Sequence, residues 1–126
     1  MKILYVDDEP DIRDVAVMAL EIDPDLEVKS AASGGEALSI LDESGFRPDV
    51  VLLDVMMPVM DGPAVLEALR KRPEHAETPV VFITARAQAH ETARFLSLGA
   101  VGVITKPFDP MTLALELRAI LSRAAG

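Results

Sequence analysis

Apolar residues along the chain gather in four short runs, and each run leads directly into a polar or charged side chain. The runs are residues 3–6, 50–53, 80–83 and 101–105. Short apolar runs rich in Val, Ile and Leu predict strands that are buried on both faces, as in a parallel sheet. A fifth, weaker strand is predicted over residues 26–31.

The segments between the runs carry apolar residues at helical spacing and are bounded by turn and cap residues. They predict five helices, which begin near Pro10, Ser33, Pro63, Ala87 and Asp109. The first helix is expected to place Ile12, Val15, Ala16, Ala19 and Leu20 on its apolar face, and the fourth Ala89, Ala93 and Leu96. The polar connection over residues 72–79 is expected to be the most mobile part of the chain, with His75 on the surface.

Strands that alternate with helices form a parallel sheet with right-handed crossovers and helices on both faces. The predicted fold class is therefore α/β: a flavodoxin-like, doubly wound, five-stranded parallel sheet in the strand order 2-1-3-4-5, with five helices. Residues 1–126 contain no repeat, linker or low-complexity tract and are expected to form one domain. In this order the first and third strands are neighbours, so Asp7, Asp8 and Asp54 are expected to meet in one crevice.

Composition excludes several classes of function. The 126 residues include 21 acidic and 12 basic side chains, and the net charge of −9 opposes direct binding to a nucleic acid backbone. No apolar run approaches the ~20 residues that a membrane span requires. The absence of cysteine excludes disulfides and thiolate metal sites. We expect a cytoplasmic protein without a membrane partner.

The side chains that end the strands indicate phosphoryl transfer. Three carboxylates in one crevice repel each other unless their pKa values rise or a cation binds. Oxygen ligands without a nearby His or Cys favour Mg²⁺. Asp54 is a candidate nucleophile towards phosphorus, and Lys106 and Thr84 are candidates to stabilise the phosphoryl oxygens.

Each of these residues also has an ordinary structural explanation. An Asp after a strand is commonly a turn or cap residue, Thr84 is a candidate N-cap, and Lys106 a candidate solvated lysine. Phosphoryl transfer is the favoured interpretation, because the structural explanations would have to hold at four strand ends at once.

The motifs resemble those of the receiver domain of two-component response regulators, of the chemotaxis-regulator type, over essentially the whole chain. The matching residues are Asp7-Asp8, Asp54 within Leu-Leu-Asp-Val-Met-Met-Pro, Met60-Asp61-Gly62, Thr84-Ala85 and Lys106-Pro107-Phe108. The resemblance implies that Asp54 is the phosphoacceptor and that Lys106 and Thr84 contact the phosphoryl oxygens. It implies a Mg²⁺ site formed by Asp8, Asp54 and the Met56 backbone carbonyl. Asp7 would contribute mainly through water, and Lys106–Pro107 would be a cis peptide.

The chain departs from the family pattern where the switch is expected. Receivers commonly carry an aromatic residue three positions before the lysine, and Val103 stands there. The switch would then act through backbone shifts of the loop that contains Thr84 and Ala85, and of the helix after it. The positions that tune phosphoryl lifetime in the family hold Met56 and Arg86, which predict slow self-dephosphorylation.

The resemblance implies a signalling switch rather than a conventional enzyme. Its partners would be a sensor histidine kinase or phosphotransferase and a downstream protein target or tethered output domain. One alternative is an interaction module that is not phosphorylated, although such modules are expected to lack Asp54, Lys106 or the acidic pair. Another is a Mg²⁺-dependent phosphohydrolase, in which an acid would be expected where Met56 stands.

Overall fold

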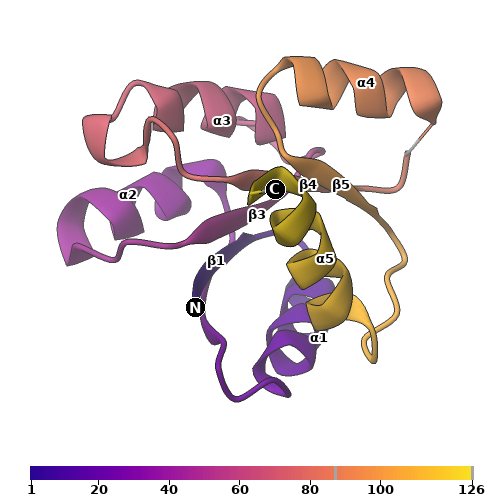
Figure 1. The fold of residues 1–126 in the computed structure, drawn as a ribbon. Coiled ribbons are helices and arrows are strands. Elements are labelled where there is room, and N and C mark those ends of the chain that lie inside the picture. Colours follow the sequence, from indigo (N-terminus) through magenta and orange to yellow (C-terminus); the bar gives the residue numbers. More distant parts are fainter. Residues whose placement is uncertain (87, 126) are drawn as a thin grey trace.

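The computed structural model describes residues 1–86 and 88–125. Five parallel strands form one sheet in the order β2-β1-β3-β4-β5, as the sequence predicts (Figure 1). The strands are β1 (Lys2–Val6), β2 (Glu27–Ala31), β3 (Val50–Asp54), β4 (Val80–Thr84) and β5 (Gly102–Thr105). Every residue of β3 and β4 is buried, which is the expected property of central strands covered on both faces.

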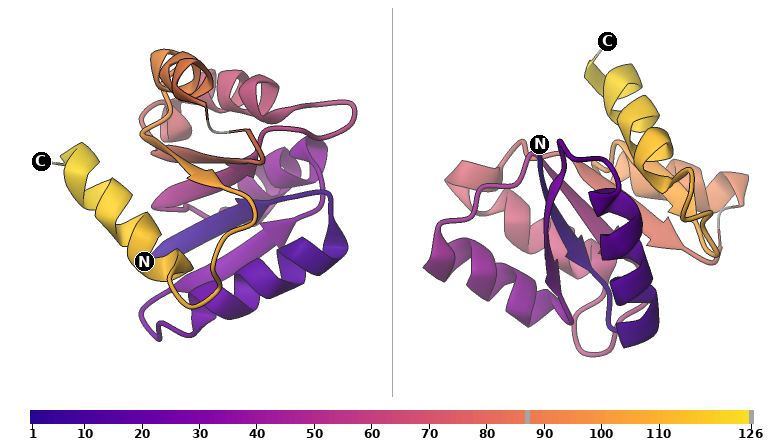
Figure 2. Two further views of the ribbon diagram at one scale, coloured as in Figure 1. Left: turned by 90° about the vertical axis from the view of Figure 1, so that its right-hand side faces the viewer. Right: turned by 90° about the horizontal axis from the view of Figure 1, so that it is seen from below.

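The described residues also form five α-helices and one 3₁₀ helix, and α5 follows the last strand. The helices are α1 (Pro10–Glu21), α2 (Gly34–Ser44), α3 (Gly62–Arg70), α4 (Ala89–Ser97) and α5 (Leu113–Ala125), with η1 at Pro73–His75. Helices α1 and α5 lie on one side of the sheet, and α2, α3 and α4 on the other (Figure 2). None of the described helices is long and apolar enough to cross a membrane.

Alternate residues of each strand enter two separate core layers. One layer packs under α1 and α5 and includes Tyr5, Leu52 and Ile83. The other packs under α2, α3 and α4 and includes Phe82 and Phe95. The flavodoxin-like, doubly wound fold is therefore confirmed.

The predicted buried faces of α1 and α4 are partly wrong. Ala16, Ala19 and Leu20 of α1 are buried as predicted, but Val15, which was expected on the same stripe, is exposed. In α4, Leu96 is exposed and Phe95 is buried against Phe82, with the two ring centroids 5.0 Å apart and edge to face. The larger apolar area of the aromatic ring decides which face of a short helix is buried.

Two helix starts also differ from the prediction. The sequence places the last helix near Asp109, but α5 begins at Leu113 after a turn in which Asp109 Oδ1 accepts the Met111 N–H. Helix α4 begins at Ala89, and Ala87, where its start was predicted, lies outside the described residues.

The connection between α3 and β4 makes hydrogen bonds to the end of α3. Arg70 Nη1 donates to the carbonyl oxygens of His75 at 3.0 Å and of Thr78 at 2.8 Å. His75 is only 4% exposed, so its predicted surface position is wrong, and burial lowers the pKa of its imidazole. Arg70, at the end of α3, thus holds two backbone carbonyls of the connection.

Val59 adopts a backbone conformation that is unfavourable for a β-branched residue. Its φ is +67°, and its side chain is exposed, so packing does not compensate for the strain. We expect Val59→Asn to raise the free energy of unfolding by about 1 kcal/mol, because Asn tolerates the left-handed region. Urea denaturation measures this change.

Val15→Asn is the matched control, because Val15 is also exposed but lies in helix α1. Valine and asparagine have similar helix propensities, so little change is expected there. An equal gain in both variants would show that surface polarity, rather than backbone strain, is responsible.

Candidate functional site

Four neighbouring strands end at one edge of the sheet, and each supplies a polar side chain there. Asp7 follows β1, Asp54 ends β3, Thr84 ends β4, and Lys106 follows β5. The register makes these ends adjacent, since Val6 pairs with Leu53, Asp54 with Ile83, and Thr84 with Thr105. The carboxyl edge of an open parallel sheet is where such folds bind ligands.

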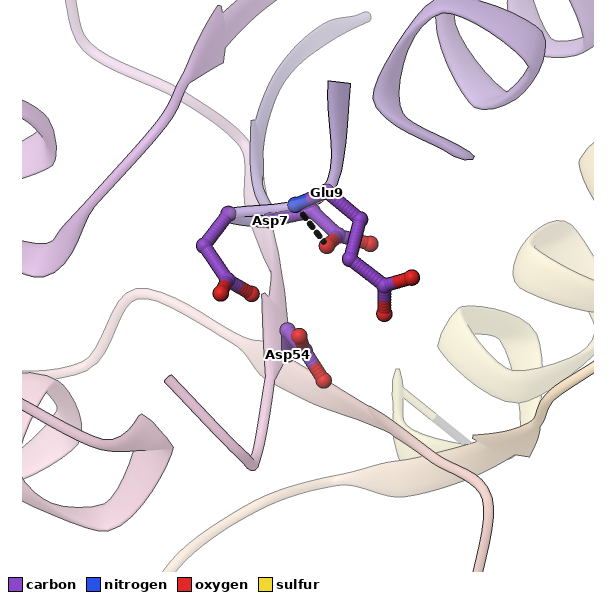
Figure 3. A group of neighbouring side chains, drawn as sticks. Asp7, Glu9 and Asp54 are labelled. Carbon is purple, nitrogen blue, oxygen red and sulfur yellow. Dashed lines mark hydrogen bonds between the residues drawn. The ribbon is translucent and has the colours of Figure 1, made fainter. Parts of the chain in front are cut away.

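Four carboxylates converge at this edge. Asp7, Asp8, Glu9 and Asp54 each offer an oxygen, and these oxygens all lie within 4.8 Å of one another. Figure 3 shows Asp54 facing Asp7 and Glu9 across the ends of β1 and β3. Asp7 is 0% exposed and Asp54 4% exposed. The donor set consists of hard oxygen ligands, which fits Mg²⁺.

Glu9 was not among the predicted site residues. It is the N-cap of α1, with an extended backbone, and its Oε1 lies 3.5 Å from Lys106 Nζ. The available signal was its position directly after Asp7-Asp8 and before Pro10, which starts the helix at the pocket.

Every oxygen of Asp7 has a hydrogen-bond donor. Oδ1 accepts the Glu9 N–H at 3.0 Å, and Oδ2 accepts the Tyr5 hydroxyl at 3.0 Å. The backbone oxygen accepts Arg13 Nη1 at 2.8 Å. These contacts allow a fully buried carboxylate to remain in place without water.

Lys106 supplies the positive charge of the pocket. Its Nζ lies 3.1 Å from Asp7 Oδ2 and 3.4 Å from Asp54 Oδ2, and its side chain is 11% exposed. Burial acts to lower the pKa of Lys106, but the Asp7 and Asp54 carboxylates outweigh burial and raise it. Burial raises the pKa of Asp54 to about 6, against the opposing effect of Lys106, and Asp7 adds to the increase. One ammonium thus contacts three of the four carboxylates, and the cluster keeps an excess of negative charge for a cation.

The raised pKa of Asp54 predicts a pH-dependent loss of stability. Between about pH 4 and 6 the unfolded chain releases a proton that the folded Asp54 retains, so the free energy of unfolding falls as the pH rises through this window. Above pH 6 the loss is constant. Asp54→Asn lacks this carboxyl and is therefore expected to be more stable than wild type above pH 6, and not at pH 4.

We expect this gain to be about 1 kcal/mol, because the substitution also removes a partner from Lys106 and solvent screens part of the repulsion. Chemical denaturation of both proteins with a chelator present, across pH 4 to 8, measures the difference. A difference that does not vary with pH would contradict the titration of Asp54.

The loop after β4 connects the pocket to the neighbouring strand. Thr84 is buried, and its Oγ1 accepts the Arg86 N–H at 3.1 Å, so its hydroxyl is engaged by its own loop. The backbone N–H of Lys106 donates to the Thr84 carbonyl at 2.8 Å. Ala85 and Arg86 are exposed.

The remaining predicted positions surround the pocket. Met56 follows Asp54 by two residues and is 77% exposed. Val103 is partly buried and packs into the core layer under α3 and α4. The Lys106–Pro107 peptide is cis, as expected from the resemblance.

An apolar groove opens beside the acidic pocket. Its volume is about 520 Å³, and its lining includes Ile12 and Val15 of α1, Pro107, Phe108, and Lys106 of the pocket. Glu9 and Lys106 of the acidic pocket therefore border a surface that has apolar contact area for another molecule.

Residues 3–118 match the sequence profile of the response regulator receiver domain. The chain is 40% identical over 122 residues to a probable transcriptional regulator ycf27 of Porphyridium aerugineum, which covers 97% of this chain and 48% of that protein. It is 34% identical over 121 residues to the response regulator SaeR of Staphylococcus aureus strain USA300, which covers 96% and 50%. The chain thus spans about half the length of these curated relatives.

Solved structures agree with these matches. The structure of the chemotaxis response regulator CheY4 of Vibrio cholerae superimposes with a TM-score of 0.85 at 35% identity, covering 94% of this chain and 97% of that one. The family is a signalling family in which phosphorylation of an aspartate is the general function. By sequence, by fold and by the polar groups gathered at its strand ends, the chain belongs to the response regulator receiver domain family.

Proposed function

We propose that residues 1–126 act as one phosphorylation-activated switch, in which Asp54 accepts a phosphoryl group from a sensor histidine kinase or phosphotransferase. The main support is the position of Asp54: it is buried at the end of β3, 3.4 Å from Lys106 Nζ and within a cluster of four carboxylates. A structural turn or cap residue has no need of a buried ammonium and three further acids.

In the proposed reaction, an Asp54 carboxylate oxygen attacks the phosphorus of a phosphohistidine. The bond from phosphorus to nitrogen breaks, and the departing imidazole takes up a proton from solvent, which leaves an aspartyl phosphate. Asp8, Asp54 and the Met56 carbonyl would hold Mg²⁺, with Asp7 contributing mainly through water. The ion would neutralise charge on the phosphoryl oxygens.

Lys106 and Thr84 would stabilise the same oxygens and change their partners in doing so. Lys106 would leave Asp7, which it contacts at 3.1 Å, and the Thr84 hydroxyl would release the Arg86 N–H. The backbone N–H of Lys106 donates to the backbone carbonyl of Thr84. This hydrogen bond would link the movement of Lys106 to that of Thr84. Phosphorylation would thereby bias a two-state equilibrium of the β4–α4 loop without an aromatic residue at position 103.

The partners would be proteins rather than nucleic acid or membrane. The apolar groove is suited to the phosphodonor, because Lys106 and Glu9 of the acidic pocket also line the groove. The net charge of −9 disfavours direct binding to DNA. A downstream protein or a tethered output domain would read the switched state in the cytoplasm. The apolar Met56 and the long Arg86 would favour slow hydrolysis of the aspartyl phosphate.

Intact-mass measurement after incubation with acetyl phosphate tests the proposal. Wild type with Mg²⁺ is expected to gain one phosphoryl group, and neither wild type with chelator nor Asp54→Asn with Mg²⁺ is expected to gain one. Asp25→Asn, which changes an exposed acid remote from the pocket, is the matched control and should be modified like wild type. An equal adduct on Asp54→Asn, or none on wild type with Mg²⁺, would contradict the proposal.

A further inference from the structure

The floor of the acidic pocket contains one polar group that phosphoryl transfer does not use. One pleat below Asp7 and Asp54, on the same face of the sheet, lie Tyr5 and its register partner Leu52, followed by Val81. All three floor residues are 0% exposed. Leucine and valine are the ordinary choice at such positions, and only Tyr5 brings an oxygen there.

The Tyr5 hydroxyl reaches up to the pocket and donates to Asp7 Oδ2 at 3.0 Å. The same oxygen is 3.1 Å from Lys106 Nζ, and the other oxygen of Asp7 accepts the Glu9 N–H. A carboxylate can only accept hydrogen bonds, so the Tyr5 hydroxyl is the donor of this pair.

We infer that Tyr5 is a positioning residue of the Mg²⁺ site, which fixes the orientation of the Asp7 carboxylate through this hydrogen bond. The inference rests on the proposed function. When Lys106 turns to the phosphoryl group, Asp7 Oδ2 loses its ammonium partner, and Tyr5 is the side chain that still holds it. A carboxylate ligand whose orientation is fixed by a hydrogen bond from another side chain binds the metal ion more tightly than one that is free to rotate.

Tyr5→Phe removes the hydroxyl and keeps the ring, so it tests the hydrogen bond with little change in packing. We expect the Kd for Mg²⁺, measured by calorimetry, to rise about tenfold, as for other partners that orient metal ligands. Ile3→Val is the matched control, because Ile3 lies on the same strand, in the same core layer, and is equally buried. It should lower stability and leave the Kd unchanged.

Two further readouts separate positioning from a structural role. In Tyr5→Phe, the Mg²⁺ concentration that gives half the maximal rate of modification by acetyl phosphate should rise by the same factor. The rate at saturating Mg²⁺ should change by less than about twofold. In an Asp7→Asn background, Tyr5→Phe should have no further effect on the Kd.

Wild type offers a readout that needs no substitution at Tyr5. Tyr5 is the only tyrosine and the chain has no tryptophan, so the intrinsic emission comes from this ring alone. The Tyr5 hydroxyl donates to Asp7, and Mg²⁺ changes the other contacts of Asp7. Titration with Mg²⁺ should therefore change the emission, with the same Kd as calorimetry.

The outcomes are distinguishable. Wild type that binds no Mg²⁺ would overturn both the proposed metal site and this inference. Wild type that binds Mg²⁺, with an unchanged Kd in folded Tyr5→Phe, would overturn the role of Tyr5 alone. If Tyr5→Phe fails to fold, the wild-type emission decides. The same emission without Mg²⁺ and at saturating Mg²⁺ would then overturn the role of Tyr5.

Discussion

Lys106→Met is expected to lower the free energy of unfolding by about 3 kcal/mol at pH 7 in the absence of divalent cations. The substitution keeps the aliphatic stem and removes the ammonium that lies within 3.5 Å of Asp7, Asp54 and Glu9. Asp7, which is 0% exposed, would then be a buried charge without a counterion. Urea denaturation with a chelator present measures the loss, and added Mg²⁺ should recover part of it because the ion binds the folded state.

Arg118→Met is the control for loss of an ion pair as such. Arg118 pairs with Asp23 at 2.8 Å, but both side chains are partly exposed, so a much smaller change is expected. Equal losses in the two variants would indicate that burial of the pocket charges has no special effect. Lys106→Met is also expected to slow modification of Asp54 by acetyl phosphate, and full activity would contradict the role of the ammonium.

Gly62→Ala is expected to lower the free energy of unfolding by about 2 kcal/mol. A Cβ at this position would lie 2.8 Å from the backbone oxygen of Asp54 and 3.0 Å from the Cα of Val55. Both atoms are backbone and cannot rotate away, and the Gly62 N–H bond to the Val55 carbonyl at 2.9 Å holds the segments together. The displacement would affect Asp54 and Met56, so modification of Asp54 should slow by about tenfold. Thermal unfolding and intact-mass kinetics measure the two effects.

Gly35→Ala provides the comparison, because Gly35 also lies in the first turn of a helix. The nearest atom to its added Cβ would be Ser33 Oγ at 4.0 Å, which is an ordinary van der Waals contact. We expect a gain of about 0.5 kcal/mol there, from the better helix propensity of alanine. A loss at Gly35 as large as that at Gly62 would rule out the close approach as the cause.

The strands, their order and the acidic pair opposite Asp54 were predictable because each depends on a local pattern. A buried parallel strand is apolar along its length, and the residues at its carboxyl end contact the ligand. Asp54 and Lys106 are therefore recognisable from the sequence as polar residues that follow apolar runs. The order of the strands then brings distant ends together.

The features that the sequence did not reveal depend on which of several apolar residues is buried, or on side chains that reach other segments of the chain. Helix α4 buries the face that carries Phe95 and leaves Leu96 exposed, because the aromatic side chain has the larger apolar area. The burial of His75 depends on Arg70 folding back over a connection that reads as polar. The contact from Tyr5 to Asp7 depends on the length of the tyrosine side chain. The sequence pattern would predict the same buried strand with valine at position 5.

Helix α4 differs from the other helices in how it is held. Phe95 is its single buried side chain, whereas α1, α3 and α5 each bury three or more residues. A rigid element with one anchor keeps rotational freedom about that anchor, and the free energy needed to reorient it is a small part of global stability. This helix also follows the loop that contains Thr84. The protein therefore combines a tightly packed sheet, which keeps Asp54 and Lys106 in register, with a helix that one buried side chain holds in place, and we expect this helix to be the element that reorients most easily.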